Sequence, residues 1–253
     1  MAEVYAGTSG WAYPSWKPGF YPAKLAATKF LQHYASRLNT VEVNYTFRHF
    51  PTEKTLRNWL AITPAEFKFS VKAHQNITHV KRLKDAAEYT RGFLTALQPL
   101  FEENRIGMVL FQLPPFLKAA PDLLQEFLSQ LPKSTRFSFE FRHPSWFNDQ
   151  VFEILRKNNS ALCVAESEKL ESPDVTTADF SYYRLRKPEY TAQELQQTSQ
   201  KVRQHLDAGR DVFVYFKHEE TPAGALYAEQ ILASIRETVR TNNPATSSAA
   251  VTD

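Results

Sequence analysis

Glycine and cysteine are scarce in this chain of 253 residues, which has 7 Gly and 1 Cys. The glycine content is well below the usual share of roughly 7%. No Gly is followed by Lys and no GxGxxG string occurs, which excludes a P-loop of the GxxxxGK[ST] type and a dinucleotide-binding fingerprint. The single cysteine, Cys163, excludes a disulfide framework and a CxxC zinc site, and no HExxH motif is present. No simple motif therefore identifies the function.

Long apolar runs are absent as well. No stretch of ~18 apolar residues occurs, and no basic region near the N-terminus leads into an apolar segment, so we expect a cytoplasmic protein without a membrane partner. Charge of neither sign dominates, since 30 Lys and Arg stand against 27 Asp and Glu, for a net charge of +3. This excess permits a nucleic acid or an anionic substrate without requiring one, because a small bias matters only where positive charges cluster.

Short apolar runs rich in Phe, Val, Tyr and Leu recur along the chain, as is typical of strands. The eight runs are residues 4–6, 40–45, 67–71, 107–113, 136–141, 161–165, 182–185 and 212–216. Segments with helical spacing lie between most of them, at 83–103, 123–131, 151–155 with its flanks, and 192–206. This alternation predicts a TIM-like (β/α)₈ barrel. A doubly wound open sheet is the alternative fold.

The sequence predicts one barrel domain over residues 1–240, because no Gly/Ser-rich or Pro-rich linker divides it. Residues 166–180 contain Pro173 and little periodicity, so we expect a short irregular unit between strands six and seven. Residues 241–253 read TNNPATSSAAVTD, which has no apolar face and predicts a disordered C-terminal tail.

Polar residues alternate with aromatic ones in several of the predicted strands. In residues 137–142, three Phe share one parity, while Ser138, Glu140 and Arg142 share the other. Because the outer face of a barrel strand packs on helices, the Phe side chains should face outward and the polar ones into the barrel. The same alternation directs polar side chains inward near the ends of other strands, namely Glu42, Asn44, Lys72, Gln112 and Arg184.

This pattern predicts a ligand site at the C-terminal mouth of the barrel. Glu140 and Glu42 are the candidate catalytic residues, as general base or acid. The candidate substrate-binding residues combine inward polar groups with loop side chains, including two Trp that would stack on a flat ligand. They are Lys72, Gln112, Arg142, His143, Arg184, Asn44, Trp11, Trp146 and Lys217. Two alternatives stay open: the charges form only an internal ion-pair network, and the Trp residues pack as a small loop core.

A metal site is a further alternative, because three histidines and three glutamates follow strand ends. They are His74, His143, His218, Glu42, Glu140 and Glu219. The neighbouring cations Lys72, Arg142, Arg184 and Lys217 would repel a dication. We therefore expect an anion rather than a metal at the mouth, and no cofactor is identified, with a divalent metal as the less favoured alternative.

Five strings follow one another along the chain: GTSGW with a later Trp and Tyr-Pro (7–22), TVEVNYTF (40–47), FKFSVKAHQNITH (67–79), FQLPP (111–115) and FEFRHPSW (139–146). Together they resemble the YecE-like family of uncharacterised proteins (domain of unknown function 72), from about residue 4 to 235. The resemblance implies a TIM-like barrel and supplies no established reaction. The likeness of the family to barrel endonucleases that act at abasic sites suggests nucleic-acid binding, by analogy of fold alone.

The chain departs from the family pattern after strands seven and eight. Where many relatives read Arg-Leu-His-Gly, this chain has Arg186 and Lys187 at the last two positions, and Lys217 and His218 stand where an Asn-rich turn is common. The added positive charge strengthens the expectation of an anion, although a ligand of the wider family need not be shared.

From these observations we predict an enzyme that binds an anionic partner, either a phosphorylated small molecule or a nucleic acid, with phosphoester hydrolysis as the candidate reaction. A non-catalytic nucleic-acid-binding protein is one alternative, and a scaffold with an internal ion-pair network is another. Glycoside hydrolysis is disfavoured, because no second acid is clearly adjacent to Glu140.

Overall fold

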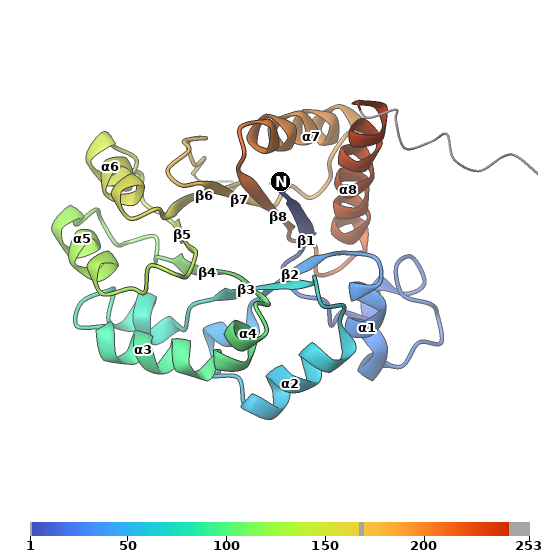
Figure 1. Cartoon of the computed structure of the whole chain (residues 1–253), viewed down its shortest axis with the longest axis horizontal. Coiled ribbons are helices and arrows are strands. Elements are labelled where there is room, and N and C mark those ends of the chain that lie inside the picture. The colour runs from blue at the N-terminus through green and yellow to red at the C-terminus, as the bar shows by residue number, and fades with distance from the viewer. Residues whose placement is uncertain (1, 167–169, 243–253) are drawn as a thin grey trace, which may run out of the picture.

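Eight parallel strands form one sheet that curls into a nearly closed barrel (Figure 1). The computed structural model describes residues 2–166 and 170–242. The strand order is β1-β8-β7-β6-β5-β4-β3-β2. The strands are β1 (Val4–Thr8), β2 (Thr40–Val43), β3 (Lys68–Lys72), β4 (Ile106–Gln112), β5 (Phe137–Glu140), β6 (Ala161–Ala165), β7 (Phe180–Leu185) and β8 (Asp211–Phe216). Each predicted strand is present, and the predicted barrel is confirmed.

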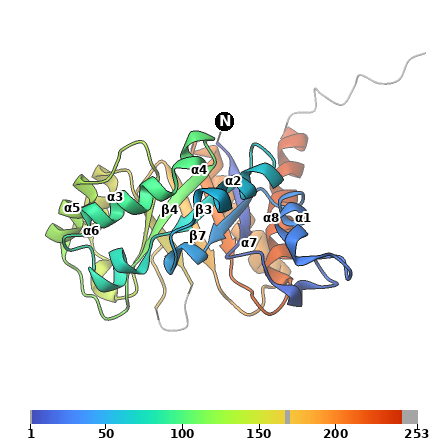
Figure 2. The same cartoon turned by 90° about the horizontal axis from the view of Figure 1, so that it is seen from below.

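Helices surround the strands and pack on their outer faces (Figures 1 and 2). They are α1 (Phe30–Ala35), α2 (Glu53–Ile62), α3 (Ala87–Ala96), α4 (Gln98–Glu102), α5 (Pro121–Ser129), α6 (Asp149–Lys157), α7 (Ala192–Asp207) and α8 (Ala223–Asn242). The loops add the short helices η1 (Pro14–Trp16), η2 (Ala27–Lys29), η3 (Tyr45–Phe47), η4 (Asn76–Val80) and η5 (Pro144–Trp146). The long helix expected at 83–103 is divided into α3 and α4, where Pro99 in the first turn of α4 has no N–H to continue the earlier helix.

The irregular unit predicted between strands six and seven is also confirmed. The residues described between β6 and β7 form no helix. The ring of helices is consequently interrupted between α6 and α7 (Figure 1).

Two apolar cores lie on opposite faces of the strands. The inner core fills the barrel with side chains such as Met108, Leu110 and Tyr182, whereas Phe139 belongs to the outer core under the helices. On that outer face the ring of Phe127, from α5, meets the edge of Phe139 at a centroid distance of 6.4 Å. The alternation of aromatic and polar residues in 137–142 therefore correctly predicts that the Phe side chains face the helices.

Side chains complete the seam between β1 and β2, where the backbone ladder is reduced to one bridge between Ser9 and Glu42. Asn39 spans this seam just before β2 begins. Its Oδ1 accepts from the Ala6 N–H at 3.0 Å, and its Nδ2 donates to the Val4 carbonyl at 2.7 Å. One amide thus replaces two missing ladder hydrogen bonds.

The Tyr34 hydroxyl closes the upper part of the same seam. It accepts from the Thr8 N–H at 2.8 Å and donates to the Thr40 carbonyl at 2.9 Å. The backbones approach so closely here that a Cβ on Gly7 would lie 2.1 Å from the Thr40 oxygen. Glycine is therefore required at this position for packing reasons rather than for its backbone angles.

The chain end differs slightly from the expectation. Helix α8 extends to Asn242, so residues 241 and 242 are helical rather than part of a disordered tail. The rest of the predicted tail, 243–253, lies outside the described residues. No helix in the described ranges combines the length and apolarity needed to cross a membrane.

We expect Asn39→Ala to destabilise the barrel, because it leaves the buried Ala6 N–H without its acceptor and the Val4 carbonyl without its donor. Each unsatisfied buried group costs roughly 1–3 kcal/mol. Urea unfolding measures the loss, and Gln32→Ala on the exposed face of α1 is the matched amide control. A change for Asn39→Ala no larger than that of the control would contradict the bridging role.

Candidate functional site

A cavity of about 510 Å³ opens at the mouth of the barrel, around the C-terminal ends of the strands. It is lined by polar and aromatic side chains from β3, β4 and β7 and from the segments after β1, β2, β5, β7 and β8. These are Tyr13, Asn44, Tyr45, Phe47, Arg48, His49, Lys72, Gln112, Arg142, Arg184, Arg186, Lys217 and Glu219. Its size suits a small molecule.

Glu42 lies at the base of this site and is fully buried. Its Oε1 accepts from Ser9 Oγ at 2.7 Å and from Arg184 Nη2 at 2.6 Å, and its Oε2 accepts from the Tyr182 hydroxyl at 2.5 Å. Burial acts to raise the pKa of Glu42, but the charge of Arg184 and these hydrogen bonds outweigh it, so the pKa falls below its ordinary value. Glu42 is therefore a carboxylate at neutral pH.

Glu140, which ends β5, is the second buried carboxylate. Arg184 Nη1 donates to its Oε2, Arg142 Nε donates to its Oε1 at 2.9 Å, and Arg186 Nη2 lies 3.1 Å from the same Oε1. Burial again opposes the charged form, yet Arg184, Arg186 and Arg142 together lower the pKa of Glu140 well below its ordinary value.

Arg184 joins the two carboxylates across the barrel. Its guanidinium donates to Glu42 through Nη2 and to Glu140 through Nη1, and the residue is only 2% exposed. Gln112 extends this network toward the cavity, since its Oε1 accepts from Arg142 Nη2 at 3.0 Å. Three strands distant in sequence thus meet in one ion-pair cluster, which we call the base cluster: Glu42, Glu140 and Arg184.

The structure brings together most of the residues predicted for the site. Six of the predicted binding residues line the cavity, namely Asn44, Lys72, Gln112, Arg142, Arg184 and Lys217. The predicted catalytic pair, Glu42 and Glu140, lies beneath them in the base cluster.

Trp11, Trp146 and His143 do not line the cavity. Trp146 is buried, stacks on Phe141 at 4.5 Å between centroids and donates to a loop carbonyl. Trp11 packs edge-on against Trp59 at 5.3 Å. His143 Nδ1 accepts from the Ser145 N–H, which caps η5. These side chains hold the loops around the mouth, because large aromatic surfaces gain more from burial against one another than from exposure.

The sequence reasoning did not include the segment after β2 in the site. Tyr45, Phe47, Arg48 and His49 line the cavity because η3 turns the chain back over the mouth directly after Asn44. Their position directly after a strand end is the sequence feature that could have assigned them to the site. Tyr13, Arg186 and Glu219 complete the lining that the candidate set lacked.

The three histidines of the alternative metal site have other contacts. His74 Nδ1 lies 3.2 Å from the Tyr89 hydroxyl, and His218 Nε2 lies 2.9 Å from the Pro188 carbonyl. Throughout residues 2–166 and 170–242, no group of three or more His, Cys, Asp or Glu side chains is arranged to hold a metal ion. The structure does not assemble the suggested ligand set.

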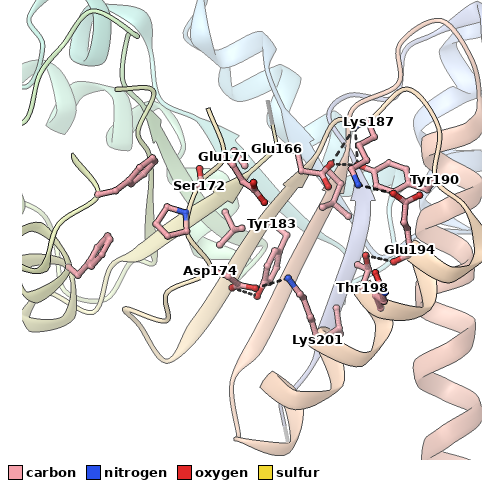
Figure 3. Close-up of a pocket in the computed structure, with 18 residues that line it drawn as sticks. Glu166, Glu171, Ser172, Asp174, Tyr183, Lys187, Tyr190, Glu194, Thr198 and Lys201 are labelled. Atoms are coloured by element: carbon pink, nitrogen blue, oxygen red, sulfur yellow. Dashed lines mark hydrogen bonds and ion pairs between the residues drawn. The ribbon is translucent and has the colours of Figure 1, made fainter. Parts of the chain in front are cut away.

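A larger cavity, of about 790 Å³, lies on the outer side of β6 and β7, where the helix is missing (Figure 3). The charged side chains shown there are largely paired. Lys201 Nζ lies 3.0 Å from Asp174 Oδ2, and Lys187 Nζ lies 2.8 Å from Glu194 Oε1. This groove leaves few charges unsatisfied, so the mouth is the better candidate for a charged ligand.

Comparisons with known proteins agree with this architecture. The family model described as protein of unknown function DUF72 matches residues 5–250. UPF0759 protein YunF of Bacillus subtilis (strain 168) is 29% identical over 160 residues, which are 59% of this chain and 54% of that protein. The match thus spans about half the length of this curated relative.

Solved structures show the same fold. A DUF72 family protein from Thermotoga maritima MSB8 has a TM-score of 0.81 at 29% identity, with 92% of this chain and 99% of that chain covered. A DUF72 family protein from Enterococcus faecalis V583 has a TM-score of 0.75 at 18% identity, with 93% and 98% covered. A family 2 AP endonuclease from Brucella melitensis, at 9% identity and a TM-score of 0.53 over 94% and 99%, is similar in fold alone.

We expect Arg184→Met to destabilise the protein by about 3–5 kcal/mol near neutral pH, because it leaves Glu42 and Glu140 charged and buried without their shared partner. Urea unfolding of wild type and variant across pH measures the difference. Arg156→Met, in an exposed pair with Glu153, is the control and should cost less than about 1 kcal/mol.

The pH dependence of this difference follows from the signs of the shifts. In the wild type the folded pKa values of both carboxyls lie below the unfolded ones, so their contribution is complete above the ordinary carboxyl pKa and is lost as pH falls. Without Arg184, burial favours the neutral acid most strongly at Glu42, because Glu140 keeps Arg142 and Arg186, and protonation of Glu42 then reduces the destabilisation of the variant. The difference in the free energy of unfolding between the two proteins should become smaller below about pH 5. A difference that grows there would refute this account.

Proposed function

We propose that this chain, which belongs to the DUF72 family of proteins of unknown function, is an enzyme that binds a phosphorylated, anionic substrate at the barrel mouth. Since the family supplies no activity, the proposal rests on the chain's own side chains. The resemblance to the YecE-like family that the five sequence strings carry is thereby confirmed. The observation that carries the proposal is the charge of the cavity wall.

Positive charge outweighs negative charge around this cavity. Six cationic side chains and one carboxylate, that of Glu219, line it in the described part of the chain. The cations are Arg48, Lys72, Arg142, Arg184, Arg186 and Lys217. Glu42 and Glu140 beneath them offset only part of this charge. A polar cavity with surplus cations attracts an anion and raises its local concentration.

Two guanidinium donors at the bottom of the cavity also lack a partner. Within the described residues, the buried Nε atoms of Arg184 and Arg186 have no hydrogen-bond partner. Arg142, whose side chain is 34% exposed, presents its planar guanidinium at the cavity wall. Guanidinium groups match phosphate oxygens in geometry and bind them through charge-assisted hydrogen bonds.

We assign Glu42 and Glu140 to the positioning of these guanidinium groups. Proton transfer at neutral pH requires a pKa near 7, whereas the pKa values of both carboxyls lie below their ordinary value. Their oxygens already accept hydrogen bonds from Arg142, Arg184 and other donors. Phosphoester hydrolysis, for which they were the candidate base and acid, stays a prediction.

Nucleic-acid binding is the second candidate, and one observation favours it. Tyr45 is 49% exposed at the rim and stacks on His49 at 5.1 Å between centroids, beside Arg48. An exposed ring next to a cation is suited to base stacking with a phosphate contact. The similarity to an AP endonuclease is one of fold and adds nothing to this argument.

We expect Arg142→Gln to weaken binding of inorganic phosphate by roughly 10- to 100-fold, because a hydrogen bond to a charged group contributes about 1.5–3 kcal/mol. Titration calorimetry measures the affinity, and circular dichroism verifies the fold. Lys157→Gln, exposed at the end of α6 on the opposite face, should bind phosphate as the wild type does.

Turnover is tested with the same proteins and a panel of phosphomonoesters and phosphodiesters. Hydrolysis by the wild type that is lost in Arg142→Gln and retained in Lys157→Gln supports an enzyme. Equal phosphate affinity in all three proteins would remove the mouth from consideration as the anion site.

Tyr45→Ala separates the second candidate from the first. If single-stranded oligonucleotides bind at the rim, this variant should lose about 1–3 kcal/mol of affinity, the usual contribution of one base stacked on an aromatic ring. Binding should also weaken as salt rises, since contacts to phosphate release counterions. Fluorescence anisotropy at two salt concentrations measures both effects, and salt-independent binding would argue against this candidate.

A further inference from the structure

Lys72 differs from the other cations at the mouth. It is the last residue of β3 and its side chain, partly buried, lines the cavity. Its Nζ lies 4.0 Å from the centroid of the Phe47 ring. The aromatic face thus covers one side of the amine, and the cavity is the space the amine can reach.

The amine has no acidic partner. In the part of the chain that the structure describes, Lys72 Nζ makes no hydrogen bond or ion pair, whereas Arg142, Arg184 and Arg186 all donate to Glu140. The oxygens of both base-cluster carboxylates are already engaged by arginines, Ser9 or Tyr182. A lysine kept for structure alone would be expected to take a carboxylate or a carbonyl as acceptor.

The surroundings also favour the neutral amine. Burial is the largest effect and, with the charges of Arg184 and Arg142, outweighs the attraction of Glu140 and Glu42 and lowers the pKa of Lys72 to about 8. His79 also lies near Lys72, and its own pKa is lowered first by burial and then by the charge of Lys72. At pH 7 roughly a tenth of such an amine is unprotonated, against less than a thousandth for an ordinary lysine.

We propose that Lys72 Nζ forms a Schiff base with the carbonyl carbon of a small phosphorylated aldehyde or ketone, whose phosphate is held by the neighbouring arginines. This inference rests on the proposed function, because the anion site binds the phosphate of the substrate and thereby holds its carbonyl close to the amine. The cavity volume of about 510 Å³ favours a small molecule over a polymer.

The chemistry is balanced without an oxidant or a reductant. The amine lone pair attacks the carbonyl carbon, a C–N bond forms, and the electron pair of the C=O π bond moves to oxygen, which takes a proton. The nitrogen loses a proton, the hydroxyl is protonated, and it leaves as water while the nitrogen lone pair forms the C=N bond. Amine, carbonyl and one proton thus give a protonated imine and water, and the protonated imine is an electron sink beside the substrate carbon.

Pyridoxal 5′-phosphate is a suitable probe, since it joins an aldehyde to a phosphate. The full-length protein is incubated with it, reduced with borohydride and mapped by peptide mass spectrometry. We expect Lys72 to be labelled first, at least ~10-fold faster than with pyridoxal, which lacks the phosphate. Inorganic phosphate should compete, and the rate should rise with pH through about 8.

Lys68→Arg is the matched control. Lys68 begins the same strand on the same face and its pKa is also lowered, first by burial, yet its Nζ donates to the Asn104 carbonyl at 2.5 Å away from the mouth. Labelling of the cavity should disappear in Lys72→Arg and persist in Lys68→Arg.

The outcomes separate the two proposals. If phosphate binds at the mouth and the probe leaves Lys72 unmodified, or labels exposed lysines such as Lys54 equally well, the Schiff-base inference is wrong and the anion site stands. If pyridoxal and pyridoxal 5′-phosphate label Lys72 at equal rates, the arginines do not bind the phosphate of the probe, and the assigned substrate class is wrong.

Discussion

A guanidinium buried between two buried carboxylates is the interaction on which the mouth of this barrel depends. Arg184 reaches from β7 to Glu42 on β2 and to Glu140 on β5, and none of the three is more than 2% exposed. An unpaired charge at this depth would cost several kcal/mol. The pairing therefore couples the positions of three strands that lie far apart in sequence, and it gives the cavity a base of fixed geometry.

The base cluster also determines which of the remaining cations at the mouth have an acidic partner. Arg142 and Arg186 share Glu140 with Arg184, so no carboxylate capacity is left for Lys72. Surplus positive charge consequently faces the cavity, and a partly desolvated amine lies within it. The proposed anion binding and the proposed amine reactivity thus have one physical origin, the small number of acids relative to bases around one buried network.

The alternation of eight apolar runs with helical segments was sufficient to predict the barrel. Polar residues near the strand ends predicted its inward-facing groups and six of the thirteen residues that line the cavity. This succeeded because strand periodicity is local: a side chain two residues along points to the same face. The loop residues could not be assigned in the same way. Trp146 resembled a ligand-stacking residue, yet it is buried against Phe141, while Tyr45 and Arg48 stand at the rim after η3. Loop packing depends on contacts between segments distant in sequence, which no local pattern records.

The sequence by itself determined the strand order along the chain, which strand faces are aromatic, and that cations outnumber acids among the inward groups. Only the tertiary structure decided which charges meet. From sequence, Glu140 was a candidate general base or acid, with an internal ion pair as the alternative, and only folding placed three arginines around it. The reason is that ion pairing and desolvation act over a few ångströms in space, and closure of the barrel sets those distances.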